Sequence, residues 1–548
     1  MYIINFPAYT VSVPDLSRCK AAARTETGWV CGARRRAVSG SVYASFLGVP
    51  YAKQPLGELR FQELLPAEPW DNIREAKAEG PVCPQTDVFY GRIKTASGGM
   101  SEACIHANIH VPIEALPDPK KPPSCGAKAA PGLPILVFIH GGGFAFGSGD
   151  TDLHGPEYLV SKGVIVITFN YRLNVFGFLS LNSTQVPGNA GLRDAVTLLR
   201  WVQRNARFFG GSPGSVTLAG QSAGAAITHI LTLSTSARSL FHRAILLSGT
   251  AFSDFFSSSP LFAKTINSLF LPLIGINATL PADEIHQKLI ETPINAIMEA
   301  NKKLINLFGT TTFTPVVESY QPGITPILED DPEVLLDSGR GSEIPLLIGF
   351  TDAECESFRP RFKQIDIVAQ IEKTPELAVS PRLKFMSGDQ LPVVAELMHN
   401  KYFNDTLDYD SFLRLCTDQY VKYPALKLAS KSSGKAPVFM YRPHVHIPHK
   451  FRAGPAQDQR VDEARRRRQN EEQDDRHHRQ LHEIQSPDAG PAGSRPMADG
   501  STPAAAVPGG KRPETPVPHA SLALRTTPAS LLRSSIQDRT PTLTQDQI

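Results

Sequence analysis

One short stretch of the sequence, residues 215–233, holds a serine in a setting suited to nucleophilic chemistry. A short apolar run leads into GQSAG at residues 220–224, and an Ala- and Leu-rich run follows. This order predicts a strand, a sharp turn and a helix, with Ser222 at the tip of the turn. Such a turn strains the backbone and holds the hydroxyl clear of its surroundings, where it could attack a carbonyl carbon. The alternative is an ordinary glycine-bounded turn whose serine only caps the helix.

A run of glycines forms a second candidate group. Gly141 to Gly143 directly follow the apolar run Pro134 to His140, which is typical of a buried parallel strand. Glycines in this position let backbone N–H groups turn toward a common point, as an oxyanion hole requires. A flexible glycine loop is the alternative, and the serine turn downstream favours the oxyanion hole.

A carboxylate follows a third apolar run. Residues 344–350, IPLLIGF, predict a strand that ends in TDAE, residues 351–354. Carboxylates just past a parallel strand lie where α/β enzymes place catalytic groups. Glu354 is therefore a candidate, although a single Glu in such a loop is more often a solvated residue.

Other apolar runs predict the sheet that would position these groups. Residues 163–171, 242–249 and 438–442 predict further strands. Residues 189–211 place apolar side chains at helical spacing until Gly210 and Gly211 stop the helix. Strands that alternate with helices indicate a mostly parallel sheet with right-handed crossovers.

Two regions fit this pattern less simply. From Arg24 to Phe61, alternating apolar residues and glycine breaks predict short antiparallel strands. Residues 250–340 mix helical segments with proline breaks, which predicts excursions over the sheet and not strands within it.

Composition places the chain among soluble globular proteins. Its 548 residues are 41% apolar and 20% charged, and the net charge of +3 is small for this length. That charge gives no reason to expect nucleic acid or an acidic membrane as a partner. The sequence contains no apolar run long enough to predict a transmembrane helix.

Signals for secretion are mixed. The first 19 residues lack a basic start and a clean hydrophobic core, so they do not predict a signal peptide. N-glycosylation sequons at Asn182, Asn277 and Asn404 are compatible with a secreted protein but also arise by chance.

The cysteines leave the compartment open as well. Seven cysteines cannot all pair with one another, so at least one thiol is free or bonded elsewhere. Cys83 and Cys104 bracket a loop that a disulfide could close. Two free buried thiols are the alternative.

The composition changes after Arg442. Residues 443–548 contain a single aromatic side chain, Phe451, and no cysteine. Such a segment cannot bury enough apolar surface to offset its chain entropy, so we expect a disordered tail. A run of four arginines, Arg465 to Arg468, could bind an acidic partner, but a solvated charge run explains it more simply. We expect a poorly ordered lead-in at 1–23, one domain at 24–442 and the tail at 443–548.

Between Arg24 and Arg442 the chain resembles the carboxylesterase/cholinesterase family (type B carboxylesterases), most closely the insect carboxylesterases. The motifs that carry the resemblance are SFLGVPYAKQPLGELRF, FIHGGGFAFGSGD, NYRLNVFGFLS, GNAGLRD and VTLAGQSAG. The resemblance implies an α/β-hydrolase fold, in which helices flank a large, mostly parallel sheet, with the C-terminal part of the fold incomplete. It also implies a serine hydrolase of small-molecule carboxylic esters that needs no metal and no organic cofactor.

The resemblance assigns roles by position. Ser222 looks like the nucleophile and Glu354 like the acid of a catalytic triad. The oxyanion-hole donors would be the N–H groups of Gly142, Gly143 and Ala223. The structural elements implied are a disulfide between Cys83 and Cys104 and two ion pairs, Arg60 with Glu102 and Arg172 with Asp194.

The chain departs from the family pattern at several positions. The family's S-E-D-C is here Ser101-Glu102-Ala103-Cys104, many members carry Gln where Ala195 stands, and Cys355 replaces a glycine after Glu354.

The largest departure concerns the catalytic base. The family's G-x-x-H-x-[DE] turn, expected roughly 110 residues after the acid, falls on ARRRRQNEEQ, which contains no histidine. His477, His478 and His482 come later without the glycine or an apolar context, and each fits a solvated histidine better. Two functions therefore compete: an esterase impaired in turnover, and a non-catalytic binding or adhesion protein on the same scaffold.

Limited proteolysis tests the expected domain boundary. A protease should remove the residues after Arg442 before it cuts the domain, because a segment without a core exposes its backbone. Mass spectrometry of the resistant fragment gives the boundary. A protected fragment that extends past residue 500 would contradict the expected tail.

Overall fold

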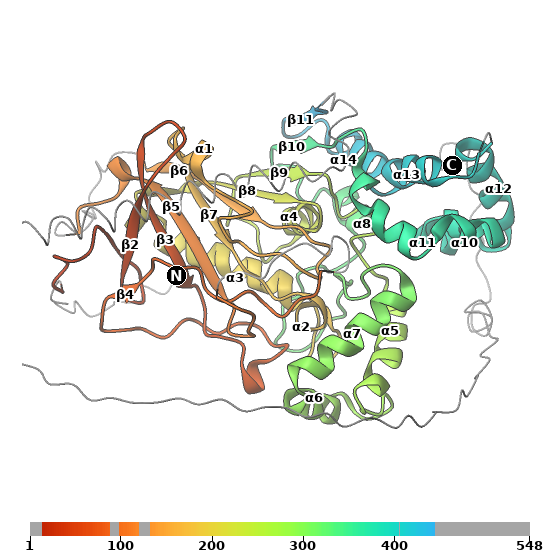
Figure 1. Cartoon of the computed structure of the whole chain (residues 1–548), viewed down its shortest axis with the longest axis horizontal. Coiled ribbons are helices and arrows are strands. Elements are labelled where there is room, and N and C mark those ends of the chain that lie inside the picture. The colour runs from red at the N-terminus through yellow and green to blue at the C-terminus, as the bar shows by residue number, and fades with distance from the viewer. Residues whose placement is uncertain (1–13, 88–97, 120–131, 405, 444–548) are drawn as a thin grey trace, which may run out of the picture. The chain divides into compact units, whose positions relative to one another are not determined.

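The computed structural model describes residues 14–87, 98–119, 132–404 and 406–443, and these residues are organised around one large mixed sheet (Figure 1). The sheet has 11 strands in the described residues, in the order β1-β2-β3-β5-β7-β6-β8-β9-β10-β11, with β4 paired to β2 off this path. The strands are β1 (Ala21–Arg24), β2 (Trp29–Arg36), β3 (Val42–Pro50), β4 (Arg74–Glu75), β5 (His106–Pro112), β6 (Leu133–Ile139), β7 (Ile165–Phe169), β8 (Gly211–Gln221), β9 (Arg243–Leu247), β10 (Leu346–Gly349) and β11 (Val438–Tyr441).

The sheet divides into an antiparallel and a parallel part. In the order given above, each pair of neighbouring strands from β1 to β7 is antiparallel. Each pair of neighbouring strands from β7 to β11 is parallel. All five residues of β7 are buried, as expected for a parallel strand covered on both faces. The prediction of a large, mostly parallel sheet flanked by helices is confirmed.

Helices of the parallel part follow their strands as predicted, with one difference at α3 (Ala190–Asn205). The helix ends at Asn205. The four residues of a 3₁₀ turn (Ala206–Phe209) separate it from Gly210, the predicted stop, whose φ is 74°. Tightening of the last turn into 3₁₀ geometry is a common way to satisfy terminal carbonyls. α4 (Ala223–Leu233) follows β8 and is buried along its whole length.

The remaining helices are excursions over the sheet. In chain order they are α1 (Glu157–Val160), α2 (Asn174–Phe178), α5 (Pro260–Leu273), α6 (Ala282–Glu291), α7 (Ile294–Phe308), α8 (Pro332–Asp337), α9 (Arg359–Gln364), α10 (Ile367–Lys373), α11 (Pro381–Ser387), α12 (Leu391–Tyr402), α13 (Tyr409–Thr417) and α14 (Tyr423–Ser432). α9 to α14 form a helical segment between β10 and β11, which we call the helical wall (Figure 1). In the described part of the chain no helix is both long and apolar enough to cross a bilayer.

Three disulfides tie the described residues together: Cys19–Cys31, Cys83–Cys104 and Cys355–Cys416. The first of these and β1 show that the fold begins before Arg24, within the expected lead-in. The sequence AAAR has no strand signal of its own, and its pairing with β2 holds it in the sheet. Residues 1–13 and nearly all of the expected tail, 444–548, lie outside the described residues.

A buried ion pair links the loop after β7 to α3. Arg172 binds Asp194 through two side-chain hydrogen bonds of 2.9 and 2.6 Å, and its backbone N–H donates to the same carboxylate. Both side chains are almost fully buried. A second buried bidentate pair joins Arg60 to Glu102, and a third, which the sequence did not suggest, joins Arg193 to Glu318.

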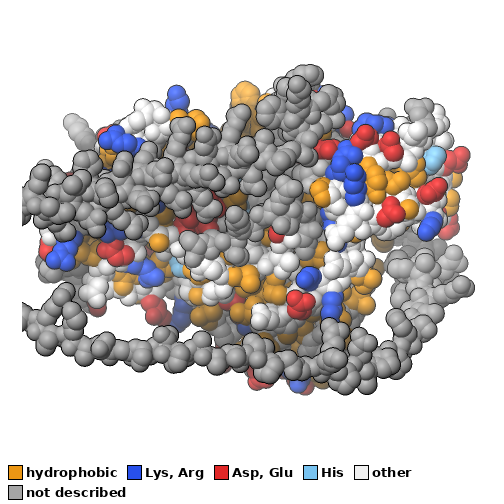
Figure 2. Space-filling model, viewed as in Figure 1, with side chains coloured by type: hydrophobic (Ala, Val, Ile, Leu, Met, Phe, Trp, Pro, Cys, Tyr) orange, Lys and Arg blue, Asp and Glu red, His pale blue; other side chains and the backbone are white. Residues whose placement is uncertain are grey.

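Where Figure 2 leaves the described residues in view, acidic and basic side chains lie interspersed. A mixed surface of this kind agrees with the small net charge of +3.

We predict that Asp194→Ala destabilises the fold by about 3–5 kcal/mol, because it leaves the Arg172 guanidinium buried without its counter-charge. Glu26→Ala is the matched control. It breaks the partly exposed ion pair between Glu26 and Arg204, which lies on α3 like Asp194, and it should cost less than about 1 kcal/mol. Urea unfolding of both variants measures the difference. Equal stability of the two variants would contradict a supporting role for the buried pair.

Candidate active site

Ser222 occupies a strained turn between β8 and α4. Its φ of 56° and ψ of −121° lie in a region that residues other than glycine rarely adopt. The backbone holds it there from both sides: its N–H donates to Leu247 O on β9, and its carbonyl accepts from Ala226 N. The side chain of Ser222 makes no cap bond to the helix. The hydroxyl therefore does not act as the helix cap that was the alternative interpretation.

The glycines that flank Ser222 permit a very close crossing of backbone segments. A Cβ atom on Gly224 would lie 2.1 Å from the carbonyl oxygen of Ile139, at the end of β6. A Cβ atom on Gly220 would lie 2.1 Å from the carbonyl oxygen of Gly224. Any larger residue at either position would push α4 away from the sheet.

The glycine loop lies directly against Ser222. A Cβ atom on Gly141 would be 3.1 Å from the Cβ atom of Ser222. Gly142 and Gly143 have φ values of 114° and 60°, which glycine adopts without strain. Within the described residues, neither of these two N–H groups donates a hydrogen bond to the protein. They are thus available as donors beside the serine.

The predicted acid is anchored by its own turn and by the neighbouring strand. Glu354 begins a 3₁₀ turn after β10 and is half-buried. Its Oε1 accepts hydrogen bonds from the Ser248 hydroxyl (2.8 Å) and from the Thr351 backbone N–H. Ser248 directly follows β9, and sequence analysis missed it because a lone serine after a strand carries no distinctive signal.

Ser222, Ser248 and Glu354 line one cavity of about 210 Å³. They come from the carboxyl ends of β8, β9 and β10, which are neighbours in the sheet. The rest of the lining is mainly apolar. It includes Phe255, Phe256, Phe308, Phe358, Phe362, Ile365, Ile367, Leu377, Phe412, Leu415 and Val421. Among the described residues that line the cavity, none is a histidine.

A disulfide forms part of the cavity wall. Cys355, next to the predicted acid, is bonded to Cys416 at the end of α13, and both residues line the cavity. The Cys355 N–H also donates to the Thr417 hydroxyl at 3.2 Å. The sequence showed Cys355 only as a departure from glycine, because its partner lies 61 residues away. The bond ties the turn that carries Glu354 to the helical wall.

The buried histidines near the turn have structural partners. His140 Nδ1 contacts Gly141 O at 2.8 Å and its ring stacks on Tyr171, while His229 Nδ1 accepts from Ala251 N. Burial lowers the pKa of each to about 3, so both are neutral near pH 7. Within the described chain, neither makes a hydrogen bond to Ser222.

The sheet, the serine turn and the adjoining glycine loop define the class of protein: an α/β-hydrolase. A model of the carboxylesterase family matches residues 20–465. The chain therefore belongs to the carboxylesterase family, and the relatives below are named as carboxylic ester hydrolases. The match begins slightly before Arg24 and continues beyond Arg442, where the resemblance in the sequence was expected to end.

Relatives and solved structures agree with this assignment. A juvenile hormone esterase of Heliothis virescens is 57% identical over 423 residues, covering 77% of this chain and 73% of that protein. Carboxylesterase 5A of Homo sapiens is 32% identical, covering 76% and 69%. The crystal structure of juvenile hormone esterase from Manduca sexta, with OTFP covalently attached, is similar at a TM-score of 0.74 with 60% identity, covering 78% of this chain and 79% of that one.

We predict that Gly224→Ala abolishes covalent labelling of Ser222 by an organophosphate, because the new methyl group would collide with Ile139 O and displace the serine turn. Gly214→Ala is the matched control: its nearest neighbour would be 3.9 Å away and its φ is not positive. Intact-mass spectrometry measures the labelling. Normal labelling of Gly224→Ala would show that the close crossing is not needed.

Proposed function

We propose that this chain is a serine esterase that forms an acyl-enzyme through Ser222. The observation that carries the proposal is the strained Ser222, which faces the glycine loop and shares a cavity with Glu354. In this proposal Gly142, Gly143 and Ala223 supply the oxyanion-hole N–H groups.

The proposed chemistry needs no metal and no organic cofactor. Ser222 attacks the ester carbonyl, and the backbone donors stabilise the tetrahedral oxyanion, each by on the order of 3 kcal/mol. A histidine oriented by Glu354 would take the serine proton and return it to the leaving alcohol. Water then releases the acid and regenerates the serine.

We further propose that the substrate is an ester with a long apolar chain. The aromatic and aliphatic lining of the cavity favours such a chain, because binding would remove its surface from water. The names of two relatives indicate juvenile hormone as the ester. We propose the same substrate class for this chain.

The catalytic base, in this proposal, has to come from residues after Arg442. β11 runs parallel to β10, so it ends at the same edge of the sheet as Glu354, and Arg442 pairs with Asp352 there. Seven histidines follow in the sequence, at positions 444, 446, 449, 477, 478, 482 and 519. None of them stands in the family's G-x-x-H-x-[DE] motif, and we therefore expect only trace turnover. A non-catalytic binding protein is the second candidate, and the same missing motif favours it.

We also propose that the protein is secreted and glycosylated. Three disulfides in the described residues favour an oxidising compartment. Asn182, Asn277 and Asn404 are all exposed, as acceptor asparagines must be.

Organophosphate labelling and ester hydrolysis together test the proposed function. The full chain should be labelled at Ser222 only slowly and should hydrolyse a short chromogenic ester at least about 10⁴-fold more slowly than an intact triad would allow, because both reactions need an activated serine. Ser222→Ala should lose the label, whereas Ser357→Ala, a serine on the same cavity wall, should keep it. Replacing everything after Arg442 with a family-type C-terminal segment should restore turnover.

Two outcomes would contradict the proposal in different ways. Absence of any label at Ser222 in the chain that carries the family-type C-terminal segment would favour the binding protein. Ordinary turnover by the full chain would show that a histidine after Arg442 acts as the base, and alanine variants of the seven histidines there would then identify it.

A further inference from the structure

The glycine loop, residues 141–147, has a backbone conformation that its glycines alone do not explain. Gly142, Gly143 and Gly147 have φ values of 114°, 60° and 114°, and Phe144 among them has a φ of 61°. A positive φ is unfavourable for a bulky side chain such as Phe, so contacts from outside the loop have to hold this conformation. The residues that make these contacts also control the two candidate oxyanion-hole donors in the loop.

The carbonyl groups of the loop set the directions of these donors. The Gly142 N–H shares a peptide group with Gly141 O, and the Gly143 N–H shares one with Gly142 O. Both peptide groups are trans, so each N–H points away from its carbonyl oxygen. His140 Nδ1 donates to Gly141 O at 2.8 Å, and Ala145 N donates to Gly142 O at 3.0 Å. Both carbonyls therefore point into the loop, and both N–H groups point out of it.

Gly147 closes the loop against its first residues. A Cβ atom on Gly147 would lie 2.5 Å from His140 Nδ1 and 2.6 Å from Gly141 O. A Cβ atom on Gly142 would lie 2.0 Å from Phe146 O, which shares a peptide group with the Gly147 N–H. A shift of Gly147 would therefore move Gly141 O directly, and it would turn the Gly142 N–H in the same peptide group.

The side-chain amide of Gln85 holds Gly147 from outside the loop. Its Oε1 accepts from the Gly147 N–H at 2.8 Å, and its Nε2 donates to Gly147 O at 3.0 Å. Nε2 also donates to Cys83 O at 3.0 Å. Turning the amide over would place its oxygen against two carbonyl oxygens, so these contacts fix its orientation. The two bonds restrain the peptide groups on both sides of Gly147.

The segment that carries Gln85 is itself anchored. Cys83 forms a disulfide with the chain just before β5. Pro84 O accepts from Asn174 Nδ2 at 2.7 Å, and the Asn174 backbone N–H donates to Phe144 O at 2.6 Å. The segment therefore supports the glycine loop at two points, directly through Gln85 and indirectly through Asn174.

We propose that Gln85 is a positioning residue for the oxyanion hole: by holding Gly147, it keeps the N–H groups of the glycine loop directed at the developing oxyanion of the ester. This inference rests on the proposed function, since it assumes that these N–H groups bind an oxyanion formed on attack by Ser222. In the described part of the chain Gln85 is not among the residues that line the cavity, so it acts through the loop. Donors fixed in advance stabilise an oxyanion because they do not have to reorient during the reaction.

Reversible binding of a boronic acid to the full chain tests this inference without any need for turnover. In octylboronic acid, boron accepts the Ser222 oxygen while the hydroxyl proton leaves to solvent, and the resulting tetrahedral anion resembles the intermediate of ester hydrolysis. Octanol has the same chain and no boron, so it reports on the cavity alone. Calorimetry gives the two Kd values, and boron NMR distinguishes the tetrahedral adduct from the free trigonal acid.

Gln85→Met should weaken the binding of octylboronic acid about tenfold and leave the Kd of octanol nearly unchanged. The variant keeps the length of the side chain and removes its hydrogen bonds, so the loop loses its alignment but keeps its donors. The loss should therefore be smaller than the roughly 10²–10³-fold cost of removing a donor outright. If Gln85→Met unfolds, Gln85→Leu replaces it, with melting curves as the check on folding.

Gln54→Met is the matched control. Gln54 makes the same kind of pairing beside the same disulfide, because its Oε1 accepts from the Ile105 N–H at 2.9 Å and its Nε2 donates to Ile105 O at 3.1 Å. In the described residues these bonds lead to the chain before β5 and not to the glycine loop. Losing them should lower stability in a similar way but leave the ratio of the two Kd values unchanged.

A Kd ratio that is the same in the Gln85 variants and in Gln54→Met would overturn the inference. Equal weakening of both probes by a Gln85 variant would also overturn it, because Gln85 would then support the cavity and not the oxyanion hole. Failure of the proposed function looks different: the unmodified chain would then give no tetrahedral boron signal, and the inference would fall with it. Ser222→Ala, which should lose that signal, identifies the adduct.

Discussion

The close crossing of α4 over the end of β6 is the constraint on which the rest of the structure depends. Gly224 approaches Ile139 O so closely that no side chain fits between them, and Gly249 is packed as tightly against the backbone of Ser222. The positive φ of Ser222 costs on the order of 1–3 kcal/mol. Burial of α4 and of the parallel strands on both sides offsets this cost, because packing of the sheet and the helix fixes the conformation of the turn.

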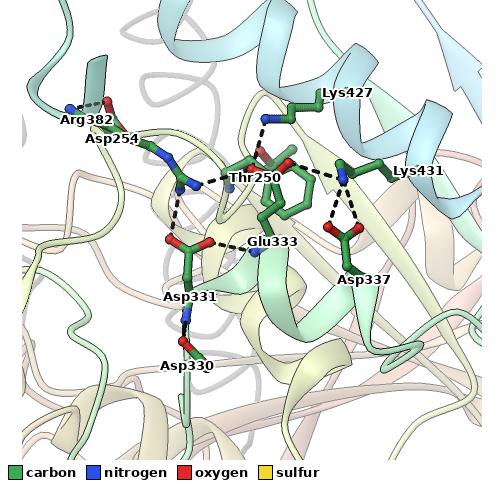
Figure 3. Close-up of polar contacts among 10 residues, drawn as sticks. Thr250, Asp254, Asp330, Asp331, Glu333, Asp337, Arg382, Lys427 and Lys431 are labelled. Atoms are coloured by element: carbon green, nitrogen blue, oxygen red, sulfur yellow. Dashed lines mark hydrogen bonds and ion pairs between the residues drawn. The ribbon is translucent and has the colours of Figure 1, made fainter. Parts of the chain in front are cut away.

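The parallel sheet and the helical wall contribute different parts of the cavity. Neighbouring parallel strands end at one edge, and this edge brings Ser222, Ser248 and Glu354 together. The helical wall supplies much of the apolar lining, together with Gln419 and Tyr420. The disulfide Cys355–Cys416 and the charged network of α8, α11 and α14 hold this wall against the sheet (Figure 3). The sheet therefore positions the candidate catalytic side chains, and the helical wall forms much of the apolar lining.

The departures from the family pattern have local compensations in the structure. Ala103 removes one carboxylate of the family motif, yet Arg60 remains fully bonded. It forms a bidentate pair with Glu102 and donates to the carbonyl oxygens of Leu289, Ile290 and Thr292 at the end of α6. A helix C-terminus favours a cation. Cys355 likewise replaces a glycine and forms a disulfide in its place.

The sequence by itself determined the order of strands and helices in the parallel part, the serine turn and the glycine loop, because these depend on local periodicity and on glycines at fixed offsets. It also contained motifs specific enough to indicate the family. Only the tertiary structure decided which distant residues meet. The Cys355–Cys416 and Cys19–Cys31 bonds, the Ser248 contact to Glu354 and the Arg193–Glu318 pair join segments whose separation along the chain carries no signal. The partner of each side chain depends on how the excursions fold back over the sheet, and that is set by packing across the whole domain and not by the neighbouring residues.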